Sequence, residues 1–276
     1  MMTEAFRAEW LKLTKNRWSM FWAWGFVPLL TLVLGVLVET FSRGTSGGAM
    51  LGYAAPIATT LDGLGSYGNI FLRLFPIAGA ATLFAGEYRW ETWRAILPRN
   101  ERSAIMLAKL CVFAAAGAIS ILLCGVAGFL TGLYEGVLFH SLHWPTAGAG
   151  EVTLALAIGF AASFLQLMAT AGVVILIAVI SRSMIASIIG GFSVFLASEL
   201  LSAFLRVRMS SASEIMALLP NVAGDALRQL AGAIRGDPDA IGVHLALPGA
   251  AALMTWCIAL SAAAIVLFRR QDLSRE

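Results

Sequence analysis

Charged residues are scarce in this sequence. Asp, Glu, Lys and Arg make up 13% of its 276 residues, whereas soluble domains carry roughly a quarter. Hydrophobic residues make up 59%, and the mean hydropathy is +0.83. A chain with this balance has too little polar surface for water, so the composition excludes a soluble protein and predicts an integral membrane protein.

Cysteine is rare as well. The three cysteines, Cys111, Cys124 and Cys257, all fall inside apolar runs. No cysteine is therefore available to form a disulfide framework outside the membrane. We interpret the three as small apolar packing residues.

The sequence also lacks the motifs of nucleotide and hydrolytic chemistry. It has no G-x-x-x-x-G-K-[ST] phosphate loop, no H-E-x-x-H, no G-x-S-x-G and no soluble region large enough for a nucleotide-binding domain. His140 and His143 lie three residues apart without a third ligand, so an interfacial pair fits them better than a metal site. We expect no enzyme activity and no bound cofactor or metal. If ATP drives this protein, another polypeptide must bring it.

Long hydrophobic runs are what the sequence does have. A transmembrane helix needs about 20 mainly apolar residues to cross a hydrocarbon core of ~30 Å. Only helices and closed barrels satisfy their backbone hydrogen bonds in lipid, and these runs lack the alternating pattern of barrel strands. The predicted fold class is an all-α integral membrane protein with a single domain over residues 1–276. The six predicted spans cover residues 18–38, 70–86, 103–133, 152–180, 184–205 and 247–268.

The start of the chain does not resemble a cleavable signal peptide. Its apolar run begins only at residue 18, is too long, and ends without a small-residue cleavage pattern. We expect it to remain as the first span.

Lys and Arg predict the orientation, because positively charged loops are retained in the cytoplasm. Thirteen of the nineteen fall on one side of the predicted spans, and both termini lie on that side. We expect both termini to be cytoplasmic. The thirteen are Arg7, Lys12, Lys15, Arg17, Arg89, Arg94, Arg99, Arg102, Lys109, Arg182, Arg269, Arg270 and Arg275.

Residues 1–17 have the pattern of an amphipathic helix lying in the inner headgroup layer. Phe6, Trp10, Leu13 and Arg17 recur at spacings of three and four, and Glu9, Lys12 and Lys15 fall on other arcs. A basic flank that only sets the topology is a consistent alternative.

The connection between the second and third runs is unusually charged, with seven charged residues from Glu87 to Arg102. On a helical wheel Glu87, Glu91 and Arg94 share one arc, whereas Trp90, Trp93 and Leu97 fill the next. The spacing predicts a short amphipathic helix of about three turns, ended near Pro98.

Two interpretations of this connection compete. It is either a topology signal with snorkelling arginines and a tryptophan belt, or a docking element for a protein partner. Acidic residues gain nothing from anionic lipid, so Glu87, Glu91 and Glu101 favour docking.

Glu199 lies inside the fifth run, where a carboxylate is costly. It is a candidate for the substrate or ion pathway. A structural pair with Arg206 or Arg73 is an equally consistent alternative. Farther along, the segment 210–246 predicts two short amphipathic helices resting on the outer membrane face, interrupted by Pro220 and Gly224.

At the charged connection the sequence resembles the ABC-2 type permeases, the membrane subunits of a class of ABC exporters. The resemblance is carried by Glu87-Tyr88-Arg89, by Thr92-Trp93-Arg94, and by Leu97, Arg99, Arg102 and Lys109. The ending from Leu267 to Leu273 is similar to the usual end of that family. Glu91 departs from the pattern, because a glycine commonly precedes the threonine.

The resemblance implies a transporter without its own ATPase site. Residues 87–102 would form a coupling segment that docks on a separate ABC ATPase subunit, which binds ATP and Mg. The permease would act as a homodimer or heterodimer among the lipids of a bacterial cytoplasmic (inner) membrane, with no nucleic acid partner. The implied contact residues are Glu87, Arg89, Trp90, Glu91, Thr92, Trp93, Arg94, Leu97, Arg99 and Arg102.

Other classes of function fit the sequence less well. A secondary transporter needs ionisable residues near the middle of several spans, and only Glu199 qualifies. A membrane enzyme needs a reactive constellation, which the sequence does not contain. Apolar spans suit a lipophilic or amphipathic cargo, such as an antibiotic, a peptide or a lipid-linked compound.

Overall fold

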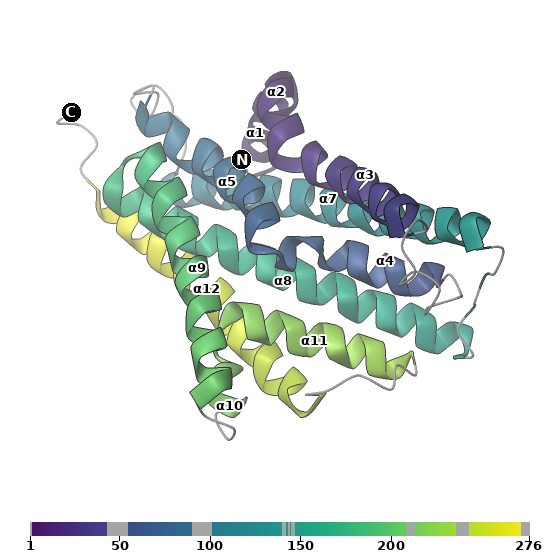
Figure 1. Ribbon diagram of the computed structural model, residues 1–276. Coiled ribbons are helices and arrows are strands. Elements are labelled where there is room, and N and C mark those ends of the chain that lie inside the picture. Colours follow the sequence, from purple (N-terminus) through teal and green to yellow (C-terminus); the bar gives the residue numbers. More distant parts are fainter. Residues whose placement is uncertain are drawn as a thin grey trace.

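The computed structural model is built from helices (Figure 1). It describes residues 2–42, 55–89, 101–139, 142, 144, 147–208, 213–235 and 243–271. The elements are α1 (Met2–Lys15), α2 (Arg17–Met20), the π-helix η1 (Phe21–Gly25), α3 (Phe26–Ser42), α4 (Pro56–Leu64), the 3₁₀ helix η3 (Gly65–Gly68), α5 (Ile70–Arg89), α7 (Arg102–Phe139), α8 (Ala149–Ser181), α9 (Met184–Arg208), α10 (Ser213–Met216), α11 (Pro220–Ile234), the 3₁₀ helix η5 (Val243–Leu245) and α12 (Ala246–Arg270).

In the part of the chain that the structure describes, six helical segments are long and apolar enough to cross a membrane. The six predicted spans and the all-helical class are therefore confirmed. The helices of the third and fourth spans, α7 and α8, extend beyond their predicted ends. They contain 38 and 33 residues. The spans are Arg17–Phe41, Ile70–Tyr88, Arg102–Leu138, Ala149–Ser181, Met184–Leu205 and Val243–Arg270.

Helix α8 occupies the middle of the bundle (Figure 1). It contacts α5, α7, α9, α11 and α12, and its span is the most buried of the six. We call the end where α5 ends, α7 begins and α12 ends the charge-rich end. Helix α1 lies at this end, because it packs against α7 and its Glu9 contacts Lys109 near the start of that helix.

The first span is not a uniform helix. The side chain of Asn16 caps α2 by accepting a hydrogen bond from the Ser19 amide at 3.3 Å, so α1 and α2 are separate helices. The predicted amphipathic pattern through Arg17 is therefore interrupted after Lys15. The π-helix η1 follows directly, a turn type that is frequent at functional sites.

The second span is preceded by a break. Helix α4 and η3 come before α5, and the extended backbone of Asn69 separates them from it. Helix α4 packs closely on α7 where small residues face each other: a Cβ on Gly128 would lie 2.1 Å from the Thr59 carbonyl oxygen, and one on Gly63 would lie 2.3 Å from that of Cys124. Gly128 and Gly132 form a G-x-x-x-G spacing, which lets two helix backbones approach.

We expect Gly128→Ala to destabilise the protein by about 1–3 kcal/mol, because the added methyl group meets rigid backbone rather than a movable side chain. A thermal unfolding curve of the purified protein measures this loss. Gly86→Ala is the matched control, since a Cβ there meets nothing within 4 Å. Equal melting temperatures for the two variants would contradict the close contact of α4 with α7.

The segment 210–246 contains two short α-helices among its described residues, α10 and α11, as predicted, but only the interruption before Pro220 is present. Helix α11 is continuous, begins at Pro220, and contains Gly224 within it. It packs against α8 and α12. Close approach is possible because Gly224 leaves room for Gln166 of α8: a Cβ would lie 2.8 Å from that side chain. The buried residues of α11 are Pro220, Asn221, Val222, Ala223, Gly224, Ala226, Leu227 and Ala231.

Candidate functional site

Lys109 is the centre of a buried charge cluster at the charge-rich end. It is 1% exposed, and its ammonium donates to Glu9 Oε2 at 2.8 Å, to Glu87 Oε1 at 3.1 Å and to the Leu83 carbonyl at 2.9 Å. The three protons of the ammonium thus all have acceptors. Because Glu9, Glu87 and Lys109 belong to α1, α5 and α7, the cluster joins three helices.

Lys12 completes the cluster from α1. Its ammonium lies 2.8 Å from Glu9 Oε1 and 3.1 Å from Glu87 Oε1. Burial by itself would lower the pKa of Lys12, but its hydrogen bonds to Glu9 and Glu87 and the charges of these carboxylates outweigh burial and raise that pKa. With two acidic and two basic side chains, the cluster (Glu9, Lys12, Glu87 and Lys109) has a formal charge of zero.

A second set of bonds ties α5, α8 and α12 together at the same end. The Tyr88 hydroxyl donates to Gln271 Oε1 at 2.8 Å. The amide of Gln271 donates in turn to the Val179 carbonyl near the end of α8. Arg102, the first residue of α7, donates to the carbonyl of Arg269 at 3.2 Å and to that of Gln271.

These bonds hold both ends of the predicted coupling segment. On one side, Glu87 and Tyr88 in the last turn of α5 are tied to α1, α7 and the residue that follows α12. On the other side, Arg102 ties the start of α7 to the end of α12.

The predicted docking residues divide into two groups. Glu87 and Arg102 lie in described helices, where they make contacts within the chain. Arg89 is the last residue of α5. The predicted short amphipathic helix and its break at Pro98 lie outside the described residues, as do Trp90, Glu91, Thr92, Trp93, Arg94, Leu97 and Arg99.

Glu199 lies in α9 within a polar network. Its Oε2 accepts a hydrogen bond from the Asn221 amide at 3.0 Å, and the same amide group donates to Ser202 Oγ at 3.1 Å. Ser198 Oγ donates to Asn221 Oδ1 at 2.6 Å. The carboxylate thus has a partner on α11, which the predicted pairing with Arg206 or Arg73 did not include.

Arg73 lies close to this network and is 1% exposed. It donates from Nε to the Tyr67 carbonyl and from Nη2 to the Gly68 carbonyl, each at 3.0 Å, so it holds the break between η3 and α5. Its guanidinium carbon lies 4.8 Å from the centre of the Phe195 ring of α9. This contact and the hydrogen bond from Asn221 to Glu199 together connect α5, α9 and α11.

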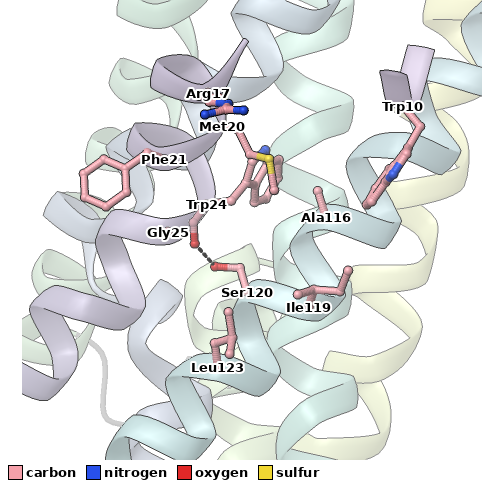
Figure 2. Close-up of a pocket in the computed structure, with 10 residues that line it drawn as sticks. All are labelled: Trp10, Arg17, Met20, Phe21, Trp24, Gly25, Ala116, Ile119, Ser120 and Leu123. Carbon is pink, nitrogen blue, oxygen red and sulfur yellow. Dashed lines mark hydrogen bonds between the residues drawn. The ribbon is translucent and has the colours of Figure 1, made fainter. Parts of the chain in front are cut away.

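An apolar groove of about 320 Å³ opens between α1, η1 and α7 (Figure 2). Its volume is at the lower end of the range for small-molecule sites. Arg17 stands at one end of the groove, and Leu123 at the other (Figure 2). The groove therefore offers one cation beside an apolar surface. Its walls include Trp10, Phe21, Trp24 and Ile119.

Among the described residues, no three His, Cys, Asp or Glu side chains are grouped closely enough to hold a metal ion. His140 and His143 lie outside that part of the chain. The described cysteines, Cys111, Cys124 and Cys257, are all free thiols.

Sequence reasoning missed the buried charge cluster. Glu9 and Lys109 are 100 residues apart. The amphipathic pattern of residues 1–17 did not distinguish Glu9 from the other polar residues of that segment. One signal was available: Lys109 lies seven residues inside the helix that begins at Arg102, and a charge there needs a partner.

Comparison with known proteins identifies the family of this chain. Residues 5–198, more than two thirds of the chain, match the family described as ABC-2 family transporter protein. No curated protein matches the chain with significance. The match includes the charge cluster and both ends of the charged connection. This multi-pass membrane protein belongs to the ABC-2 transporter family.

Proposed function

We propose that the chain is the permease subunit of an ABC exporter driven by a separate ATPase subunit. The charge-rich end faces the cytoplasm, in agreement with the distribution of Lys and Arg. The ATPase subunit binds ATP and Mg and docks on the coupling segment, and the permease itself hydrolyses nothing. The permease works as a homodimer or heterodimer in the cytoplasmic membrane of a bacterium.

One observation carries the mechanical part of this proposal: both ends of the coupling segment are bonded to the helix bundle. A segment that hung loosely between two spans would absorb the movement of a docked subunit. Here Glu87 and Arg102 connect it to α1, α7 and α12. Movement of the ATPase subunits would therefore reach the spans, which would switch between loading and releasing the cargo.

The groove in Figure 2 supports an amphipathic cargo. Its walls are apolar, and the cation of Arg17 stands where the proposed orientation places the inner headgroups. Among the described residues Arg17 has no acidic partner. A molecule with a hydrophobic body and a polar or anionic end would fit this arrangement.

The docking role is tested in the part of the segment that does not belong to the charge cluster. We expect Trp93→Ala and Arg94→Glu each to weaken the complex with the co-expressed ATPase subunit at least tenfold, because aromatic and arginine anchors dominate interfaces. Co-purification and permease-stimulated ATP hydrolysis provide the two measurements. Glu87 is a poor choice here, because its replacement also disrupts a buried cluster.

Arg270→Glu is the matched control for this experiment, since Arg270 is an exposed arginine at the same end of the bundle. If the control weakens the complex as much as Arg94→Glu, the effect is one of general charge and docking on the segment is wrong. Transport that proceeds without any ATPase subunit would favour a secondary transporter instead.

A further inference from the structure

Helix α11 carries a polar stripe along the arc that is less buried than its apolar face. Its members recur at spacings of three and four, so they share one arc of the helix. The Asp225 side chain is 47% exposed and that of Arg228 19%, and Gln229 is exposed. The α11 stripe consists of Asp225, Arg228, Gln229, Gly232 and Arg235.

The stripe reaches the depth of the hydrocarbon core. Arg228 Nη1 donates to Gln166 Oε1 at 3.1 Å, and Gln166 is close to the middle of α8, roughly 25 Å from Ala149 and 22 Å from Ser181 along the helix axis. If α8 crosses a hydrocarbon core of ~30 Å, Gln166 lies inside that core at every position that the helix can span. Arg228 and its 2.6 Å partner Asp225 therefore lie inside it too.

Half-buried charges at this depth do not face lipid, because ionisable groups within spans line water or pair with protein. The backbone beside the stripe leads to the same conclusion. A Cβ on Gly68 would lie 2.7 Å from Arg228 Nη2, so Arg228 lies against the end of η3, next to the extended backbone of Asn69. Non-helical backbone at membrane depth is tolerated only within protein or beside water.

Two buried groups near the stripe lack a hydrogen-bond partner within the described part of the chain. They are Arg73 Nη1 and Ser163 Oγ. Ser163 lies one turn before Gln166 on α8, and Arg73 donates to the carbonyl of Gly68, the residue that Arg228 lies against. Buried polar groups without protein partners are usually satisfied by water.

We propose that the α11 stripe lines a water-filled path inside the membrane-spanning part of the protein. The path presents a carboxylate and a guanidinium side by side. It therefore suits the charged or zwitterionic part of an amphipathic molecule, whose anionic and cationic groups would meet Arg228 and Asp225. The inference of a water-filled path requires only that the helices span a membrane. The inference that cargo passes along it rests on the proposed export function.

Substituted-cysteine labelling tests the path. In a variant whose three native cysteines are replaced by alanine, Asp225→Cys and Gln229→Cys are exposed to a membrane-impermeant sulfonated methanethiosulfonate from either side of membrane vesicles. This reagent needs a hydrated thiolate. Gln229→Cys removes no charge, so it keeps the test valid if Asp225→Cys fails to fold. The control is Ile258→Cys, which is apolar, 69% exposed and about 18 Å from both ends of α12.

We expect labelling at positions 225 and 229 to be at least tenfold faster than at position 258. Equal rates at all three positions would overturn the proposal. Rapid oxidation of Asp225→Cys to a disulfide-linked dimer, without labelling by the reagent, would also overturn it and would assign the stripe to a contact with a second copy. None of these readouts needs the ATPase subunit or the cargo, so failure of the path is distinct from failure of the proposed function.

Discussion

Replacement of Lys109 by methionine is expected to lower the stability of the protein by about 3–5 kcal/mol, because it leaves two buried carboxylates with only the half-exposed ammonium of Lys12 beside them. Glu9 and Glu87 both lie within 3.1 Å of the Lys109 ammonium. Their repulsion would separate α1 from α5 and release one end of the coupling segment. We therefore expect loss of complex formation with the ATPase subunit as well. Thermal unfolding and co-purification measure the two effects.

The triple variant Glu9→Gln, Glu87→Gln and Lys109→Met distinguishes the charge cluster from simple packing. It removes both carboxylates together with the cation, so no buried charge is left alone, and most of the lost stability should return. Lys15→Met provides the matched control, because Lys15 is an exposed lysine of α1. A single variant Lys109→Met that melts like the wild type would disprove the structural role of the cluster.

Replacement of Arg73 by methionine is expected to have the second large effect, a loss of about 3–5 kcal/mol. It removes two hydrogen bonds from a charged donor, each of about 1.5–3 kcal/mol, and orphans the carbonyl groups of Tyr67 and Gly68. The break before α5 would loosen, and α5 would lose its contact with Phe195. Arg73→Lys should recover only part of the loss, because a lysine cannot donate in the same planar fork. Thermal unfolding of the purified variants checks both values.

The same experiment decides the role of Glu199. In a double-mutant cycle of Arg73→Met with Glu199→Gln, a structural pair predicts a coupling free energy of at least 0.5 kcal/mol. Glu199→Gln alone keeps an acceptor for Asn221 and removes only the charge. A carboxylate that serves the substrate pathway would instead show no coupling, and the variant would lose transport while keeping its melting temperature.

The spans were predictable because their signal is local. An uninterrupted apolar run of about 20 residues must cross a membrane as a helix, whatever its neighbours are. The predicted end of the fifth helix, residue 205, lies close to its observed end at Arg208. The break at Asn16 was missed, because an amphipathic pattern continues across it while the cap depends on one side chain and one amide.

Helix α11 shows the limit of pattern reasoning. Its polar and apolar arcs were visible in the sequence and were assigned to a membrane surface, where lipid would cover one side and water the other. The structure places the apolar arc against α8 and α12. The same amphipathic pattern fits either location, since only the neighbouring helices determine which surface covers the apolar arc.

The sequence by itself determined the membrane class, the number of spans, the absence of a phosphate loop and the position of the charged connection, because each follows from residues that are adjacent in the chain. Only the tertiary structure decided which charges meet. Glu9 reaches Lys109 across 100 residues, and Arg228 reaches Gln166 across 62. A charge inside a span must find a partner or water, but which one it finds depends on how the helices pack.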